Sequence, residues 1–159
     1  MTEQFSVHVS HQPIDTQQIV EQVRSFAAGA VVLFLGTARE FTDGRQTAQL
    51  AYEAYAEMAE RELAKLIEQA ADRWPIDRCR IVHRLGVIEL REVCVAVALS
   101  TPHRQEAFAA AQWIMDELKR SVPIWKQEQW SDGTRDWVHP GVENRQAADE
   151  TPGDRSSLA

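Results

Sequence analysis

The sequence predicts an α+β domain with about three helices and with strands paired in a mixed or antiparallel manner. The 159 residues suffice for one domain, and 44% hydrophobic with 26% charged residues is ordinary globular composition. Segments with strand and helix patterns alternate along the chain, an order that fits either an α/β or an α+β architecture. Two hairpin signals, Asp43-Gly44 and Asp132-Gly133, favour α+β because such turns join antiparallel strands.

The chain begins with a predicted strand and a predicted helix. Phe5–Val9 alternates between apolar and polar side chains, as a half-buried strand does. Asp15 and Gln18 have the spacing of a capping box, which satisfies free backbone N–H groups at the start of a helix. The apolar face expected for this helix consists of Ile19, Val23 and Phe26.

Two strands and a second helix are predicted next. Ala30–Gly36 is a continuous apolar run rich in β-branched residues, which indicates a buried strand. After the Asp43-Gly44 turn, a further strand is expected around Gln46–Tyr55. A helix follows and ends at Pro75, because proline cannot continue the backbone hydrogen bonding. Its apolar residues at helical spacing are Ala59, Leu63, Leu66, Ile67, Ala70 and Trp74.

The second half of the chain repeats this alternation. Strands are expected near Arg78–Leu85 and Glu92–Ser100, separated by a turn region around Gly86. Thr101-Pro102 predicts the start of a helix, with proline at its first position. The apolar stripe of that helix consists of Phe108, Ala111, Met115 and Leu118. Strand-like residues follow at 124–128 and 135–138, on either side of the Asp132-Gly133 turn.

The boundaries of the domain are also predicted from composition. Residues 1–146 are expected to form the single domain and residues 147–159 a disordered tail, because AADETPGDRSSLA is small, polar and unpatterned. No apolar run approaches the roughly 20 residues that span a bilayer, and the first residues lack the pattern of a secretory signal. These features predict a cytoplasmic protein without membrane association.

Charge and composition argue against several classes of function. The net charge of −7 argues against non-specific nucleic-acid binding, which requires a field that attracts phosphate, although a local basic pocket can still bind a small anion. The five histidines show no ligand spacing, and the two cysteines form no zinc pattern, so no metal site is predicted. Cys79 and Cys94 are interpreted as buried, inert thiols and not as sulfur carriers.

Four cationic positions stand out, and each has a purely structural alternative. Lys119 lies eleven residues after Phe108, about 20° from it around a helix, so it borders the apolar stripe. It is either a lysine whose stem packs along the apolar surface while its charge reaches water, or a partly desolvated catalytic lysine. Taken alone, Lys126 is more readily a solvated strand lysine. His103-Arg104 lie where a helix N-terminus binds anions, and Arg39 follows a strand end where ligand groups occur, but surface roles fit both. Together the four positions predict an anionic substrate.

Several stretches of the chain resemble the large subunit of molybdopterin synthase. These stretches are FLGTAR (34–39), LAYEAY (50–55), IVHRLGVIE (81–89), STPHRQEAFAAAQWIMDELK (100–119), VPIWKQE (122–128) and WV (137–138). They occur in order and at similar spacing from about residue 5 to residue 140. The register that links His103-Arg104, Lys119 and PIWK is too specific for chance similarity.

The resemblance implies a sulfurtransferase that needs no cofactor in this polypeptide. The family adds two sulfur atoms to cyclic pyranopterin monophosphate and so makes the dithiolene of molybdopterin. The sulfur arrives as a thiocarboxylate on the C-terminal glycine of a small ubiquitin-like subunit, whose tail inserts into the large subunit. The family fold is the α+β type called the α/β hammerhead, and a homodimer of large subunits forms the centre of a heterotetramer.

The resemblance also assigns site residues. Its substrate-binding positions correspond to Thr37, Ala38, Arg39, His103, Arg104, Lys119, Lys126, Gln127 and Glu128. The catalytic role falls on Lys119, with Lys126 in support. GTAR stands where GxVR is common, and Gln127 where a second basic residue is usual, so the departures affect fine substrate contacts. A further family arginine near the C-terminus has no clear counterpart, and Arg145 stands as a guess for it.

The implied roles agree with the charges. Arg39, His103 and Arg104 suit a cyclic phosphate and a pterin, while Lys119 could steer the thiocarboxylate and transfer protons, helped by the like charge of Lys126. About fifteen residues of one helix, or roughly 22 Å, separate Arg104 from Lys119, which predicts a site shared between two chains. The competing hypothesis is a non-catalytic, dimeric anion-binding or scaffolding module that has kept the fold, and the intact Lys119 and Lys126 argue against it.

Overall fold

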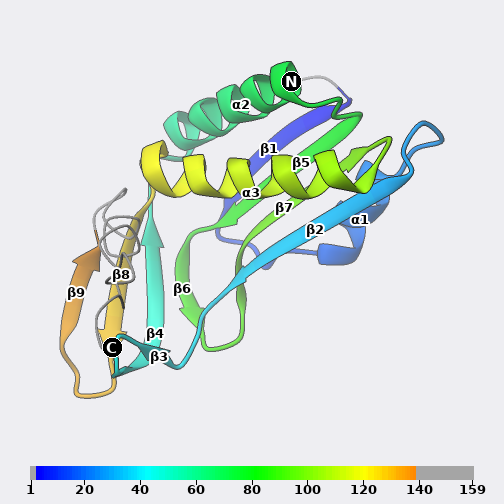
Figure 1. The fold of residues 1–159 in the computed structure, drawn as a ribbon. Helices are drawn as coiled ribbons and strands as arrows, with labels where there is room; N and C mark the ends of the chain where they lie inside the picture. Colours follow the sequence, from blue (N-terminus) through cyan, green and yellow to red (C-terminus); the bar gives the residue numbers. More distant parts are fainter. Residues whose placement is uncertain (1–2, 139–159) are drawn as a thin grey trace, which may run out of the picture.

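The computed structural model describes residues 3–138, which form three helices and nine strands (Figure 1). The helices are α1 (Thr16–Val23), α2 (Ala56–Arg73) and α3 (Arg104–Ser121). The strands are β1 (Phe5–Ser10), β2 (Ala30–Thr37), β3 (Phe41–Thr42), β4 (Arg45–Glu53), β5 (Arg78–Arg84), β6 (Gly86–Glu89), β7 (Val93–Thr101), β8 (Trp125–Trp130) and β9 (Arg135–Val138). The arrangement confirms the predicted α+β class and three helices. The expected boundary at residue 146, the tail 147–159 and Arg145 lie outside the described residues.

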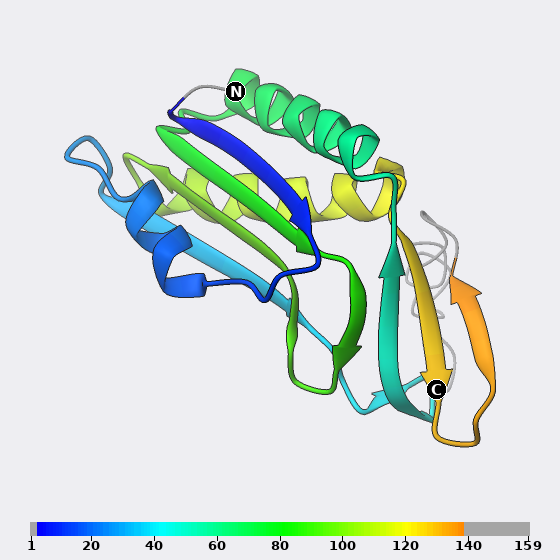
Figure 2. The ribbon, with the colours of Figure 1, turned by 180° about the vertical axis from the view of Figure 1, so that it is seen from behind.

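The first sheet is a four-stranded layer in the order β1-β5-β7-β2. β1 and β5 are parallel and the other two pairs are antiparallel, so the sheet is mixed as predicted. Helices α2 and α3 lie across one face, and α1 covers the opposite face (Figures 1 and 2). β5 and β7 are therefore the covered centre of this sheet, and β1 and β2 are its edges.

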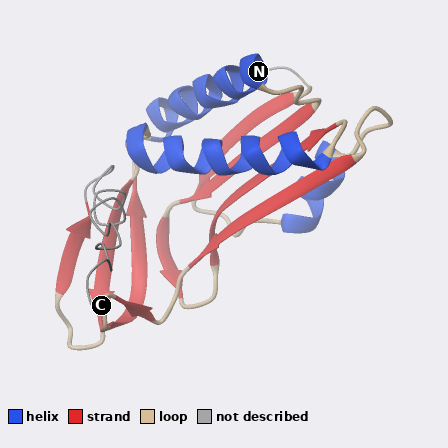
Figure 3. Cartoon of the chain, in the orientation of Figure 1, coloured by secondary structure: helices blue, strands red, loops and turns tan. Residues whose placement is uncertain are grey.

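The second sheet contains five antiparallel strands in the order β3-β4-β8-β9, with β6 also paired to β4. It lies beside the first sheet, and the chain crosses between the two sheets after β2, β4, β5, β6 and β7 (Figure 3). The predicted hairpin at Asp43-Gly44 is confirmed, because Thr42 pairs with Arg45 and both turn residues have positive φ, 50° and 78°. Such a two-residue turn requires left-handed conformations at both positions, which asparagine, aspartate and glycine tolerate best.

The main hydrophobic core lies between the first sheet and helices α2 and α3. The predicted α2 stripe is confirmed through Ala70, and Trp74 caps the C-terminus of the helix just before Pro75. A smaller cluster under α1 consists of Ile19, Val23, Ala96 and Ala98. Asp15 caps α1 as predicted, because its side chain accepts a hydrogen bond from the Gln18 backbone N–H at 3.0 Å.

Three details of the predicted helices are wrong. α1 ends at Val23, so Phe26 does not share its apolar face and is fully exposed. α3 begins at Arg104 with His103 as its N-cap, so Pro102 is not the first helical residue. The reason is that β7 continues to Thr101, whose backbone groups are used by strand pairing. Phe108 is 63% exposed and does not belong to the α3 stripe.

Two details of the predicted strands are also wrong. The sequence predicts a buried strand for β2, but β2 is an edge strand, and Val31, Phe34 and Leu35 are 40%, 39% and 36% exposed. The region around Gly86 is more than a turn, because residues 86–89 form β6 against β4. Gly86 still provides a sharp change of direction at the start of β6, with a positive φ of 84°.

Candidate active site

Two lysines flank the short connection where α3 ends and β8 begins. Lys119 lies in the last turn of α3, one turn beyond the buried Met115, and its side chain is exposed. Lys126 is the second residue of β8 and its side chain is 18% exposed. Burial is the main influence on the Cys94 thiol and raises its pKa, whereas the charges of Lys119 and Lys126 lower it. Both lysine charges therefore act on the same buried thiol.

Cys94 connects the two lysines to the end of β2. Its thiol donates a hydrogen bond to the Gly36 carbonyl at 3.2 Å and accepts one from the Tyr52 hydroxyl at 3.6 Å. A side chain at Gly36 would come within 2.6 Å of the Val95 side chain, so glycine permits this close approach of β2 to β7. Both cysteines are buried and free, as predicted, and burial raises the pKa of Cys79 to about 12.

The segment after Gly36 exposes two of the predicted site residues. Ala38 is buried, and its backbone N–H donates to Glu92 at 3.1 Å while its carbonyl accepts from Arg91 at 2.7 Å. These bonds hold the segment against the start of β7, which is the strand that carries Cys94. The side chains of Thr37 and Arg39, on either side of Ala38, are exposed. The structure thus brings the 37–39 segment and the lysines to the same end of the first sheet.

The buried carboxylate of Glu128 lies next to the Lys126 ammonium. The Lys126 ammonium lies 3.3 Å from a carboxylate oxygen of Glu128, which is only 3% exposed. The second carboxylate oxygen accepts a hydrogen bond from the Thr47 hydroxyl at 3.3 Å. Gln127, between the two charged residues, faces the opposite side of β8 and accepts a hydrogen bond from Gln129 at 2.8 Å. Lys126 is therefore not the simple solvated strand lysine that its sequence context suggests.

The remaining predicted residues lie at the other end of α3. His103 and Arg104 line an open pocket of about 460 Å³ together with Gln105, Glu106 and Phe108. α3 is continuous from Arg104 to Ser121, so its fifteen-residue rise places Arg104 about 22 Å from Lys119. Within one chain, the structure does not bring these two groups together.

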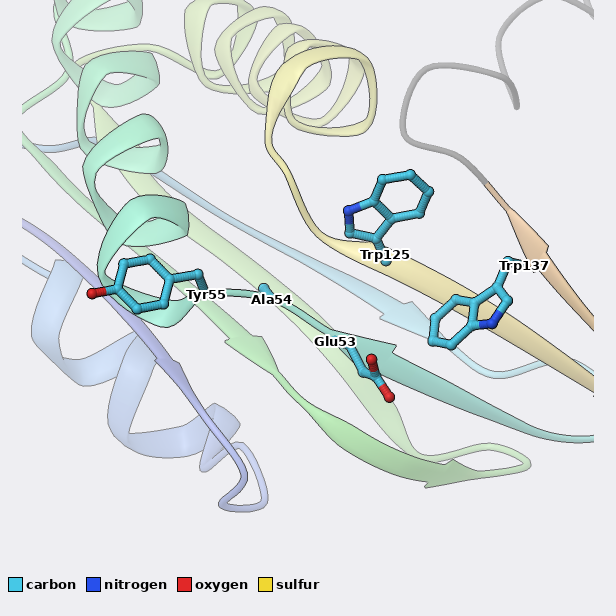
Figure 4. Close-up of a pocket in the computed structure, with 5 residues that line it drawn as sticks. All are labelled: Glu53, Ala54, Tyr55, Trp125 and Trp137. Carbon is cyan, nitrogen blue, oxygen red and sulfur yellow. The ribbon is translucent and has the colours of Figure 1, made fainter.

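Sequence reasoning missed a second pocket on the outer side of the second sheet. Its volume is about 400 Å³, and it is lined by Glu53, Ala54, Tyr55, Trp125 and Trp137. In Figure 4 the two indoles extend from β8 and β9 above the Glu53 carboxylate in this view, while the Tyr55 ring points away from them. The signal that could have found it is the strand alternation, which places Trp125 and Trp137 opposite the inner face that carries Lys126.

Two further observations concern the described residues 3–138. They contain no group of three histidine, cysteine, aspartate or glutamate side chains arranged to hold a metal ion. Within the same range, none of the helices is both long and apolar enough to cross a membrane.

Comparison with known proteins identifies the family. The family model described as MoaE protein matches residues 9–121, which is more than half of the chain. The chain belongs to the MoaE protein family. A relative from Halalkalibacterium halodurans named molybdopterin synthase catalytic subunit is 42% identical over 144 residues, covering 91% of this chain and 92% of that protein. A relative of the same name from Bacillus subtilis is 38% identical and covers 85% of each chain.

Solved structures of MoaE relatives share the fold. The crystal structure of molybdopterin synthase from Staphylococcus aureus superimposes with a TM-score of 0.77 at 38% identity, covering 87% of this chain and 98% of that one. A chain from a Helicobacter pylori complex of subunits 1 and 2 of molybdopterin-converting factor gives a TM-score of 0.66. At 17% identity this second likeness concerns the fold alone. The fold expected from the sequence resemblance is thereby confirmed.

Proposed function

We propose that this chain is the catalytic subunit of a cytoplasmic molybdopterin synthase. In this proposal it transfers two sulfur atoms to cyclic pyranopterin monophosphate, each from the C-terminal thiocarboxylate of one copy of a small ubiquitin-like subunit, which is left as a carboxylate. The names of its relatives support the enzyme class. The observation that carries the proposal is the placement of Lys119 and Lys126, two of only three lysines in the chain, on either side of the short connection from α3 to β8.

The two lysines have different surroundings and therefore suit different roles. Lys119 is exposed at the end of α3, where an incoming thiocarboxylate can reach it, so we assign it the proton transfers that accompany sulfur transfer. Lys126 is held near a buried carboxylate and suits a fixed charge that stabilises the negative charge developing on the reacting groups. The exposed Thr37 and Arg39 side chains extend this cationic surface along the end of the first sheet.

We also propose that the complete site contains residues from two chains. About 22 Å separates Arg104 from Lys119 on the unbroken α3, so one small ligand cannot contact both within one chain. The exposed edge of β2, with Val31, Phe34 and Leu35, supports contact with a second copy. Such an edge presents free backbone groups and apolar side chains, which suit pairing with another strand.

Pairing through β2 would bring the two halves of the site together, because the ends of β2 lie next to them. Its first residue, Ala30, pairs with Thr101 next to His103, and its last residue, Thr37, pairs with Val93 next to Cys94. Eight residues of strand span about 26 Å, close to the separation of the two halves of the site. Antiparallel pairing of two β2 strands across a two-fold axis would set the start of one against the end of the other. His103 and Arg104 of one copy would then approach the lysines of its partner.

Reconstitution tests the function. The purified chain is mixed with a thiocarboxylated small subunit and cyclic pyranopterin monophosphate, and the dithiolene product is measured. Product formation by the wild-type chain and by Lys65→Ala, with loss in Lys119→Ala, is the expected result. Lys65 is the matched control because it is an exposed lysine on α2, paired with Glu62 at 2.7 Å and far from the site in sequence. An inactive wild-type chain would favour the non-catalytic anion-binding module.

Subunit mixing tests the shared site. Lys119→Ala and Arg104→Ala proteins are each expected to be inactive, but random exchange gives half mixed dimers, each with one intact site. About a quarter of wild-type activity should return. The control replaces Arg104→Ala by the double variant Lys119→Ala/Arg104→Ala, which can form no intact site with its partner. If exchange is verified and the activity stays at the level of the single variants, the site lies within one chain.

A further inference from the structure

The environment beneath Lys126 contains a polar arrangement that the proposed reaction does not by itself require. Strand alternation puts Lys126 and Glu128 on the same, inner face of β8, with the ammonium 3.3 Å from the carboxylate. Glu128 is 3% exposed and Thr47, which donates to its second oxygen, is 1% exposed. The Glu128 carboxylate is therefore held from two sides, by a charged partner on its own strand and by a hydroxyl on β4.

A β-bulge brings Thr47 into this arrangement. Gln49 pairs with Gln129, but the next pair toward the strand start is Thr47 with Trp130, so Ala48 is passed over. Without the bulge, Ala48 would stand opposite Trp130 and Thr47 would turn to the outer face. A bulge of this kind redirects one side chain at the cost of one ladder position, and such features are commonly found next to functional sites. Here the redirected side chain is the one that reaches Glu128.

Stability alone gives little reason for this arrangement. Removing a carboxylate and an ammonium from water is costly, and a well-packed apolar pair of similar size is commonly as stable or more so. What a buried, hydrogen-bonded carboxylate does provide is a fixed direction for the group that pairs with it. Because the Lys126 side chain is only 18% exposed, it has little freedom once its ammonium is held at that point.

We propose that Glu128 and Thr47 are positioning residues, which hold the Lys126 ammonium in place for the reaction and do not contact the substrate themselves. This proposal rests on the proposed function of the site. It gives Glu128 a different role from the substrate contact implied by family resemblance, and it adds Thr47, which lies outside every stretch that carries that resemblance. A side chain that is 3% exposed and engaged through both oxygens is poorly placed to bind a ligand from solvent.

Kinetic measurements on the complete enzyme separate positioning from substrate contact. Glu128→Gln keeps the shape but removes the charge, and we expect it to lower kcat by about tenfold while the KM for the pterin changes less than about twofold. The misplaced ammonium still attracts an anion but no longer meets the reacting groups correctly. Thr47→Val should give a smaller loss in kcat, and Thr47→Ser, which keeps the hydroxyl, should restore it. Glu89→Gln is the matched control, an exposed glutamate on the outer face of the same sheet.

A stability cycle tests the pairing without using activity. Lys126→Ala should lower the melting temperature because it leaves the Glu128 carboxylate buried without its partner. Adding Glu128→Gln to Lys126→Ala should raise the melting temperature again, although each change alone removes a native contact. Purely additive effects of the two substitutions would show that the pair is not coupled and would overturn the proposal.

The outcomes also separate this inference from the proposed function. A main effect of Glu128→Gln on KM would indicate direct substrate contact, and an unchanged kcat would exclude positioning. If the wild-type chain makes no product while the stability cycle shows coupling, the proposed function fails but the Thr47–Glu128–Lys126 arrangement stands. If the wild-type chain is active and the cycle is additive, only the positioning role fails.

Discussion

The buried Arg80 and His83 of the first sheet and the buried Glu128 of the second sheet are held by different kinds of partner. In the first sheet, Arg80 donates to the backbone carbonyls of Gln4 and Cys79, and the His83 ring contacts the backbone carbonyl of Arg84 at 3.0 Å. In the second sheet, the buried Glu128 is satisfied by side chains, one of which is Lys126. Backbone partners are fixed by the fold itself, whereas side-chain networks can be arranged around a particular charge.

The two sheets also differ in how much of their surface is covered by helices. Helices lie on both faces of the first sheet, and β7 is buried from Cys94 to Thr101. The second sheet keeps an exposed outer face, where Trp125 and Trp137 are 39% and 50% exposed. The comparison supports our proposal that the chemistry belongs to the junction of the two sheets, where β2 ends and α3 leads into β8, whereas the first sheet provides stability. Substitutions in the two regions should therefore affect different measurements.

The largest effect is expected at the junction. Lys119→Ala should reduce sulfur transfer by at least about 100-fold, the usual contribution of a positioned proton-transfer group. Because Lys119 is exposed, its loss should change the free energy of unfolding by less than about 1 kcal/mol, mainly through the helix dipole. Single-turnover kinetics and thermal unfolding check the two parts. Near-normal turnover would contradict the catalytic assignment, and a large loss of stability would contradict the separation of the two regions.

The next largest effect is expected at β2, the edge strand of the first sheet that exposes apolar side chains. Phe34→Asp should shift the protein from dimer to monomer, because it puts a charge on the apolar edge of β2 that we propose pairs with a second copy. Activity should fall with the dimer, since each site then lacks one half. Sedimentation and activity measured on the same samples provide the check. Phe41→Asp is the matched control, an exposed phenylalanine on β3 of the other sheet; equal effects of both substitutions would contradict the edge assignment.

A comparison of β2 with β7 shows what the sequence can and cannot predict. β2 and β7 are both continuous apolar runs and both were predicted as strands, and both are strands. Only β7 is central, and β2 is an edge with exposed apolar side chains. Hydrophobicity indicates that a segment will be covered, but not whether its own chain or another one covers it. Local periodicity also places Phe26 and Phe108 on apolar helix faces, although both are exposed, because an apolar residue need not face the core of its own chain.

The candidate site was predictable to a similar extent. Motif register and helix spacing locate Lys119, Lys126 and the 37–39 segment, and the structure brings these groups to one end of the first sheet. The partner of Glu128 was not predictable, because Thr47 is 81 residues away and reaches it only through a bulge. Nothing in the local sequence around residue 47 announces that bulge. Contacts that depend on the register of distant strands are absent from any local pattern.

A smaller effect, on stability alone, should appear with pH in the first sheet. Burial lowers the pKa of His83 from 6.5 to about 4, so below pH 6.5 the unfolded chain takes up a proton that the folded chain does not. The contribution of the neutral His83 to the free energy of unfolding is therefore fully present above pH 6.5. It is lost progressively as the pH falls toward 4, by at most about 3 kcal/mol. Denaturant unfolding at several pH values measures this slope.

His83→Gln provides the comparison for that measurement. Glutamine does not titrate, so the variant should lose less stability than the wild type between pH 6.5 and 4. Above pH 7.5 the difference between the two proteins should be constant, because both side chains are then neutral in both states. Parallel curves over the whole range would show that another group causes the acid sensitivity.

The smallest effect is expected from truncation after Gln146. Residues 147–159 contain few apolar side chains and no helical or strand periodicity, so removing them takes away no segment able to bury apolar surface. The family model also ends well before them, at residue 121. Unfolding free energy and turnover should both stay within experimental error of the full-length chain. The sharper readout is affinity for the small subunit, measured by calorimetry on both forms. A large loss of affinity on truncation would mean that this segment, and not only the two sheets and their junction, contributes to partner binding.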